Sequence, residues 1–426
     1  MVIIIWRLSL ITSNPINYFE LMTVSIRPFK AFRPDEKWVE EVVLPTFDNL
    51  TEKQLDKILK KSKYNFLNVV SPEAFYPNIS KKNSRRHASQ HLKEMIDNKV
   101  IFQDSSNCFY VYCLHKYGKK QFGIVASVNV KKKNKNILKH EDIYVSKANS
   151  ILKTIENTKM QVGPVYLSYK DKTDLNKIYS KYKKKKPLYK FKTPGGTERS
   201  LWKVDNLKEI NFINSNLSRI KNFYIADGHH RFAAMESLRR KTNKNKGLRK
   251  KNVSLLAAIF DDKSVNILSF HRLIKIKNFD KNLFLNSLKE IFPQIKSANF
   301  KNPSCNGELM IYVRNKWYYV ELTKNKKIYN KFETDVEIVE KVIIKNILKR
   351  YSKFKLEKMI NVPGKFDHKK LMRDVNSGLA DVAFFICPMK MKKIMSLADR
   401  GKIVPKKSTY FDPKPADVLV NLLMNI

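Results

Sequence analysis

The hydrophobic and polar positions of this chain follow two different periods. Between Cys108 and Val130 the apolar positions recur with a period of two on both sides of a polar turn that contains Gly118, which predicts a β-hairpin. The charged stretch from Ser84 to Asn98 has instead the texture of an exposed helix. Strands and helices therefore both contribute to the fold.

The same patterns predict elements along the rest of the chain. We expect further strands at 223–226, 253–260, 267–276 and 381–387, and a second hairpin of strands 308–313 and 316–322 across Arg314-Asn315. We expect further helices at 52–61, 232–240, 367–376 and 389–399. The strands and helices alternate without a uniform strand–helix–strand rhythm. This order indicates the α+β, or mixed α/β, fold class.

The chain divides into four segments. Residues 1–21 begin with an apolar run that Arg7 interrupts and no small-residue cleavage site follows, so we expect a non-native extension before a start at Met22. The other three are an N-terminal α/β segment, a central core and a C-terminal α/β domain, at residues 22–100, 101–280 and 281–426. No run approaches the roughly 20 apolar residues that cross a bilayer, so we expect no membrane partner.

The charge of the chain is strongly positive. It has 84 Lys and Arg against 39 Asp and Glu, a formal net charge of +45, which suggests a polyanionic partner. Only 16 of these 84 residues are arginine, the side chain that matches two phosphate oxygens at once. The lysine bias fits a compositional origin better, so nucleic acid stays open as a partner but is not favoured.

The four cysteines indicate a reducing compartment. They are Cys108, Cys113, Cys305 and Cys387, and no pair has the two-residue spacing of a zinc or redox motif. Three of them lie in apolar, strand-like runs, where a reduced thiol behaves as a small hydrophobic group. We therefore predict a cytoplasmic location.

The strongest candidate site is a box of polar residues, Asp227 to Arg231, between a buried strand and a helix. Such a junction exposes backbone N–H groups that no carbonyl satisfies, and these bind anions together with the helix dipole. Gly228 allows a phosphate to approach the backbone, and Arg231 adds a bidentate charge. Asp227 can hold a metal ion or accept a proton. The alternative is a structural helix cap with buried histidines.

Other polar clusters are candidates for the same site; they are His140-Glu141-Asp142, His271-Arg272, Lys407-Ser408 and Arg27. Glu141 beside a histidine offers a base or a metal ligand. Arg272 lies within an apolar strand, where a charge is costly unless it faces a cleft or is paired. An exposed loop or a structural role is the alternative for each cluster.

Several segments resemble a widespread bacterial family of uncharacterised proteins. They are Ile26–Pro34, Lys139-His140-Glu141, Gly163-Pro164-Val165, the box with Ala226, His271-Arg272 and Pro405–Phe411. The resemblance covers nearly all of the chain from Met22. The box is also similar to that of the ADP- or ATP-dependent free serine kinases, which share a fold with the partitioning protein ParB and with sulfiredoxin.

This resemblance implies a ParB/sulfiredoxin-like core at residues 101–280. It also implies a phosphotransferase that, with Mg²⁺, transfers a phosphoryl group from ADP or ATP to a small hydroxyl acceptor such as L-serine. Glu141 would be the base, with Asp227 and His230 as further catalytic residues and Asp227 as the Mg²⁺ ligand. The nucleotide phosphates would contact Gly228, His229, His230, Arg231 and Arg272. Auxiliary roles would fall to His140, His271, Arg27, Lys407 and Ser408.

Two other functions remain open at this point. The first is a nucleotide-dependent DNA-binding or switch protein, as the ParB relatives suggest, whose DNA affinity would fall steeply with salt. The second is a metal-dependent hydrolase with His140, Glu141, His229 and His230 as ligands, because imidazole is a common zinc ligand.

Overall fold

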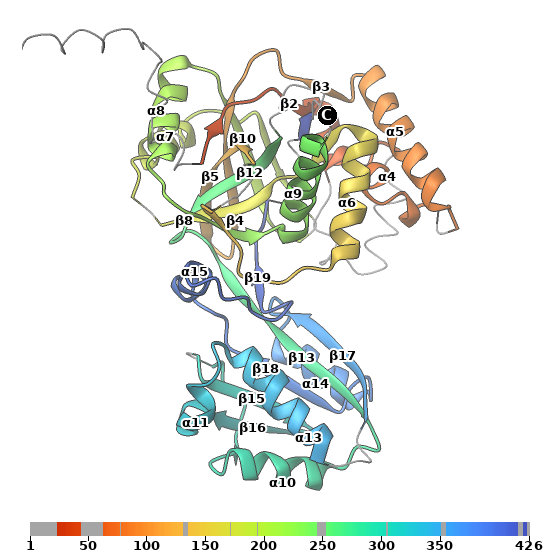
Figure 1. The fold of residues 1–426 in the computed structure, drawn as a ribbon, viewed down its shortest axis with the longest axis vertical. Helices are drawn as coiled ribbons and strands as arrows, with labels where there is room; N and C mark the ends of the chain where they lie inside the picture. The colour runs from red at the N-terminus through yellow and green to blue at the C-terminus, as the bar shows by residue number, and fades with distance from the viewer. Residues whose placement is uncertain are drawn as a thin grey trace, which may run out of the picture.

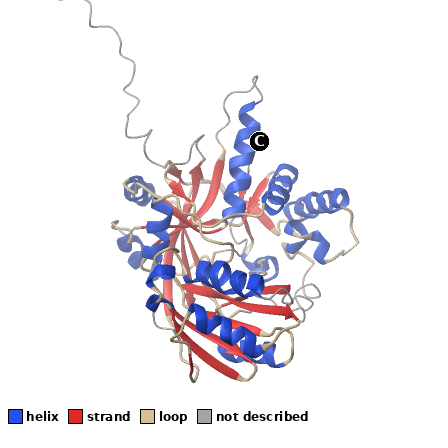
Figure 2. Cartoon of the chain, turned by 60° about the horizontal axis from the view of Figure 1, so that its bottom comes forward, coloured by secondary structure: helices blue, strands red, loops and turns tan. Residues whose placement is uncertain are grey.

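The computed structural model describes residues 24–43, 63–76, 78–130, 135–170, 172–193, 195–244, 253–303, 306–350, 355–415 and 421–423. The predicted extension at 1–21 and the predicted helix at 52–61 lie outside these residues, as does Cys305. The described strands form three sheets, with helices against their faces (Figures 1 and 2). This arrangement confirms the mixed α/β class, while the ParB/sulfiredoxin-like fold of the core stays a prediction.

The largest sheet has nine described strands. Its order is β6 (Ile137–Leu138), β11 (Phe223–Asp227), β8 (Val165–Tyr169), β12 (Ser254–Asp261), β5 (Lys119–Asn129), β4 (Phe109–Lys116), β10 (Glu198–Val204) and β9 (Tyr189–Lys192), with β1 (Ile26–Arg27) also on β5. Among these strands β12 runs parallel to β8 and β11 parallel to β6, and the other described pairs are antiparallel. The predicted hairpin at 108–130 is confirmed as β4 and β5, which turn at Tyr117 and Gly118.

Two smaller sheets complete the described strands. One has the order β3 (Ile101–Gln103), β2 (Ala31–Pro34), β20 (Asn421–Leu423) and β7 (Met160–Val162). The other has the order β14 (Lys296–Ser297), β16 (Lys316–Glu321), β15 (Glu308–Val313), β18 (Val382–Ile386), β13 (Ile267–Lys277) and β17 (Lys355–Pro363), with β19 (Thr409–Phe411) on β13. The predicted hairpin across Arg314 and Asn315 is confirmed as β15 and β16.

Helices cover the sheets. The longer ones are α5 (Lys81–Asp97), α6 (Val145–Thr158), α7 (Asn176–Lys183), α8 (Leu207–Ser218), α9 (His229–Lys244), α10 (Lys281–Ile291), α14 (His368–Asn376) and α15 (Met391–Asp399). The shorter ones are η1 (Glu36–Trp38), α2 (Val39–Val42), α4 (Leu67–Val70), η3 (Pro72–Ala74), η4 (Leu322–Lys324), α11 (Lys326–Tyr329), α12 (Asp335–Glu337), the π-helix η5 (Ile338–Ile344) and α13 (Lys345–Arg350). None of the helices in the described ranges is long and apolar enough to cross a membrane.

Strand β13 connects the two large sheets (Figure 1). Its first residues, from Ile267 to Ser269, pair with β19, and the residues that follow pair with β17 and β18. The chain then returns, because Met391, Val404 and Phe411 pack in the same core as the nine-stranded sheet. The segment from 281 to 426 therefore contributes to both cores.

The three described cysteines, Cys108, Cys113 and Cys387, are buried and free, as predicted. Burial raises the pKa of the Cys113 thiol to about 12. This thiol is therefore protonated at neutral pH and acts as a core residue rather than as a nucleophile.

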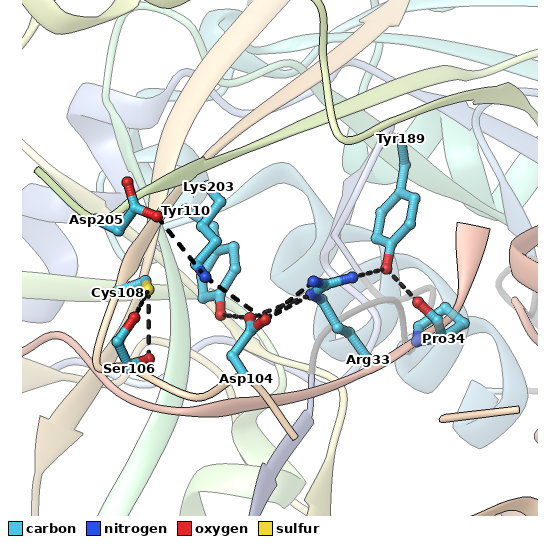
Figure 3. A network of polar contacts seen from close by, with 9 residues as sticks. All are labelled: Arg33, Pro34, Asp104, Ser106, Cys108, Tyr110, Tyr189, Lys203 and Asp205. Atoms are coloured by element: carbon cyan, nitrogen blue, oxygen red, sulfur yellow. Dashed lines mark hydrogen bonds and ion pairs between the residues drawn. The ribbon is translucent and has the colours of Figure 1, made fainter. Parts of the chain in front are cut away.

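A buried ion pair attaches the N-terminal segment to the large sheet (Figure 3). The Arg33 guanidinium lies 2.9 Å from a carboxylate oxygen of Asp104 and donates to the Tyr189 hydroxyl at 2.6 Å. The Tyr110 hydroxyl also donates to Asp104. Burial alone would raise the pKa of Asp104, but these hydrogen bonds outweigh it and the pKa is lowered. The carboxylate therefore stays charged and holds β2 against β4.

The substitution Asp104→Ala is expected to cost about 3–5 kcal/mol in the free energy of unfolding, because it leaves the Arg33 charge buried without its partner. Urea denaturation at pH 7 measures this loss. The matched control is Asp205→Ala, whose side chain is 60% exposed and lies 3.7 Å from Lys203. It should cost no more than about 1 kcal/mol, and equal losses in the two variants would contradict the prediction.

Candidate functional site

The box forms a sharp corner between a buried strand and a helix. Strand β11 ends at Asp227, Gly228 has a φ of 98°, and α9 begins at His229. A Cβ at position 228 would lie 3.4 Å from the Cα and Cγ2 atoms of Val165, so the neighbouring strand leaves little room for a side chain. The Phe232 N–H closes the first helical turn by donating to the Gly228 carbonyl at 2.9 Å. The N–H groups before it point out of the helix N-terminus, as an anion site requires.

The corner is open to water. The side chains of Asp227 and Arg231 are 28% and 19% exposed, and Gly228 and His230 are also partly exposed. His229 is buried. The four partly exposed positions of the box are therefore in contact with water, which those of a sealed helix cap would not be.

Two cations hold the Asp227 carboxylate in its charged form. The Lys414 ammonium lies 3.1 Å from one oxygen, and the Arg231 guanidinium lies 3.5 Å from the other. Burial raises the pKa of Asp227, but these two charges outweigh it and bring the pKa to about 2. Arg231 also donates to the carbonyl of Pro164, so its guanidinium connects the box to the loop before β8.

Glu141 lies close to Asp227, but its carboxyl group has a much higher pKa. Its backbone pairs with Val404, and the N–H groups of Lys407 and Ser408 favour the ionised form of its carboxyl group. Burial raises the pKa of Glu141 to about 7, and the negative charge of Asp227 adds to the rise. The side chain nevertheless stays partly exposed. A water-accessible carboxyl group with a pKa near neutrality is suited to general-base catalysis.

The three histidines nearest the corner are neutral at pH 7. Burial lowers the pKa of His140 to about 4, and it also lowers the pKa of His229 and His230. The His140 and His229 rings meet edge to face at 4.7 Å, and His140 Nε2 lies 3.2 Å from the Thr409 hydroxyl. His230 Nε2 accepts from the Tyr144 N–H at 2.9 Å. The positive charge at the corner therefore comes from arginine and lysine.

The other predicted site residues lie at different places. Lys407 and Ser408 lie near Glu141, where their N–H groups favour its ionised form. Arg27 is exposed, donates to Ser25, and lies on β1, which β5, β12 and β8 separate from β11. His271 stacks on Phe385 at 3.9 Å and accepts from the Ile386 N–H, and no described contact connects it to the box. Arg272 is fully buried and contacts the carbonyl of Lys407.

The corner offers a carboxylate but no cluster of metal ligands. Among the described residues no group of three or more His, Cys, Asp and Glu could hold a metal ion by itself. Mg²⁺ needs only one or two protein carboxylates when a nucleotide supplies the other oxygens. Asp227, the predicted ligand, is such a carboxylate, and its two oxygens pair with Lys414 and Arg231.

Sequence reasoning missed Lys414, which pairs with Asp227. Thr409, which contacts His140, lies in the segment Pro405–Phe411 but had no predicted role. Lys414 stands between Pro413 and Pro415, and two prolines around one lysine are the signal that could have singled it out. A pocket of about 120 Å³ also borders Ser408; it is lined further by residues such as Asn306, Thr334, Asp335 and Lys393.

Comparison with known proteins gives a family and several distant similarities. The family model described as "Protein of unknown function (DUF1015)" matches residues 26–344. An ATP-dependent L-serine kinase from Staphylothermus marinus is 23% identical over 193 residues, which cover 45% of this chain and 66% of the kinase.

Solved structures with similarity include a free serine kinase in complex with AMP, at 14% identity and a TM-score of 0.35, covering 70% of this chain and 91% of that one. A C-terminally truncated SbnI from Staphylococcus aureus has 13% identity and a TM-score of 0.34, covering 67% of this chain and 82% of that one.

The substitution Glu141→Gln is expected to stabilise the protein at pH 8 but not at pH 5. Because the pKa of Glu141 rises from 4.5 to about 7 on folding, the folded state holds this proton more tightly than the unfolded chain. Wild-type stability therefore falls as the pH rises from about 4.5 to about 7.

Melting temperatures of the wild type and the variant at pH 5 and pH 8 measure the difference. The neighbouring Asp142→Asn, whose side chain is 63% exposed, is the control and should show no such difference; an unchanged Glu141→Gln melting temperature at pH 8 would contradict the assignment.

Proposed function

The chain belongs to the DUF1015 family, and we propose that it is a phosphotransferase that moves a phosphoryl group from ADP or ATP to a small hydroxyl acceptor such as L-serine. The observation that carries the proposal is the pair of carboxylates at the corner, Asp227 with a pKa of about 2 and Glu141 with a pKa of about 7. Two carboxyl groups with pKa values moved apart are typical of sites that assign acid and base roles. The similarity to an ATP-dependent L-serine kinase supports this chemistry.

Each group has a role in the proposal. The N–H groups at the start of α9 and the Arg231 guanidinium would bind the nucleotide phosphates beside Gly228. Asp227 stays ionised through Lys414 and orients Arg231. Mg²⁺, when bound with the nucleotide, would neutralise phosphate charge. Glu141 would accept the proton of the acceptor hydroxyl, since its pKa lies near neutral pH.

The histidines change one part of the predicted scheme. His229 and His230 are neutral, so within this proposal they contribute backbone N–H groups and shape rather than charge. His140 and His229 form a buried pair behind the corner and support it. A nucleotide-dependent DNA-binding protein stays a hypothesis, which the salt dependence of DNA affinity would test.

The direct experiment mixes the purified protein with Mg²⁺, free L-serine and either ADP or ATP, and measures phosphoserine. We expect turnover by the wild type. We expect a loss of at least about 100-fold in Glu141→Gln, because the base is removed, and a similar loss in Asp227→Asn, because Arg231 loses its partner. A folded wild type without turnover on either nucleotide, or an Asp227→Asn variant as active as the wild type, would exclude the proposal.

A second test concerns the backbone of the corner. Gly228→Ala places a Cβ at a φ of 98° and 3.4 Å from Val165, so the N–H groups must shift and nucleotide affinity should fall at least about tenfold. The matched control is Gly378→Ala, at a φ of 80° with nothing within 4 Å of the added carbon, far along the chain after α14. Calorimetric titration with ADP should show normal affinity in the control, and equal affinity in both variants would contradict the role of Gly228.

A further inference from the structure

The small pocket that borders Ser408 has no role in the reaction proposed so far. We propose that this pocket binds the primary ammonium group of a small molecule, with Asp335 as the counter-ion. The proposal rests on the proposed function only in naming the hydroxyl acceptor as that molecule.

The pocket has a volume of about 120 Å³, and α12, α15 and the end of β18 contribute to its lining. This volume is several times the roughly 30 Å³ of one water molecule in the liquid, but it is below the roughly 300 Å³ at which pockets begin to hold drug-sized ligands. The pocket therefore suits a small organic molecule and not a nucleotide. Its apolar side chains are those of Phe332, Val336, Ile386 and Met389.

Asp335 presents a buried carboxyl group to this pocket. The residue is 6% exposed, and its Oδ2 atom accepts from the Gly307 N–H at 2.8 Å. Among the described residues no hydrogen bond or ion pair reaches the other oxygen, Oδ1. Burial raises the pKa of Asp335 to about 6, so the group is ionised at pH 8. A buried carboxylate with one oxygen left to bind is a site for a cation, because its charge is costly without a partner.

The other acid of the pocket, Glu333, already has its cations. Arg400 donates to both of its carboxylate oxygens, at 2.9 and 3.0 Å, and the Lys393 ammonium donates to one of them at 3.2 Å. In the described part of the chain no ion pair joins Lys393 to Asp335. The pocket therefore contains one carboxylate with a cation partner and one without. An ammonium group supplies the opposite charge and three N–H donors to the second.

The pocket lies next to the candidate site, along the segment that leads into β19. Ser408 lines the pocket, and the hydroxyl of the next residue, Thr409, lies 3.2 Å from His140 Nε2. Glu141 follows His140, and its backbone pairs with Val404 of the same segment. Hydroxylated amino acids and amino alcohols carry an ammonium and a hydroxyl group within a few bonds. This class of acceptor matches a site with an ammonium pocket on one side of the segment and the proposed base on the other.

The experiment compares two probes by calorimetric titration of the full chain at pH 8. L-serine has the ammonium group, and 3-hydroxypropionate differs from it by lacking that group. We expect the wild type to bind L-serine at least about tenfold more tightly, because the analogue leaves the Asp335 charge unpaired. Asp335→Asn should abolish this difference, since the amide keeps an oxygen for the Gly307 N–H but loses the charge.

The matched control is Asp381→Asn. Asp381 is a partly buried acid just before β18 that lies 3.1 Å from Lys275 and does not line the pocket, so this variant should bind L-serine like the wild type. If Asp335→Asn does not fold, Asn306→Lys carries the test, because Asn306 lines the pocket and the new ammonium group would occupy it. A wild type that binds neither probe or both equally, or normal L-serine affinity in the folded pocket variants, would overturn the proposal.

Kinetics connect the pocket with the proposed reaction. In the phosphoserine assay, Asp335→Asn should raise the KM for L-serine at least about tenfold and leave the KM for the nucleotide within about twofold. An unchanged KM for L-serine would overturn the assignment of the pocket to the acceptor. A wild type that binds L-serine through Asp335 but forms no phosphoserine would exclude the proposed function alone.

Discussion

The segment from Val404 to Pro415 holds both carboxylates of the candidate site, and the rest of the arrangement depends on it. The Val404 N–H donates to the His140 carbonyl at 2.8 Å, which fixes the backbone beside Glu141. A few residues further on, the charge of Lys407 favours the ionised form of Glu141, and Lys414 pairs with Asp227. The candidate site therefore includes residues of a segment that follows the second sheet in the chain.

This dependence has an electrostatic reason. Each carboxylate loses part of its contact with water in the fold, which raises its pKa unless a cation or a donor compensates. Asp227 pairs with two cations and is ionised, whereas the compensation at Glu141 is weaker and its pKa rises to about 7. The segment from Val404 to Pro415 thus compensates the Asp227 carboxylate strongly and the Glu141 carboxylate weakly. The difference between the two acids follows from that unequal compensation.

Sequence patterns predicted the local elements better than the site. The hairpins at 108–130 and 308–322, and the helix after Asp367, depend on period and turn residues that lie close together in the chain, and the structure confirms them. The box was visible because Asp227 to Arg231 are contiguous. Lys414 and Glu340 could not be predicted in the same way, since their importance comes from contacts with residues far away in sequence, which periodicity does not encode.

Strand β13 and the chain that returns after it relate the second sheet to the candidate site. The start of β13 pairs with β19 beside the candidate site, and its middle pairs with β17 and β18 in the same seven-stranded sheet. No described strand pair joins this sheet to the nine-stranded one, but Met391, Val404 and Phe411 pack in the core of the latter. Arg272 follows directly after the change of partner and contacts both Glu340 and Lys407. The buried contacts of Arg272 therefore connect η5 with the turn at Lys407, and Lys414 beyond that turn pairs with Asp227, so the C-terminal segment contributes directly to the candidate site.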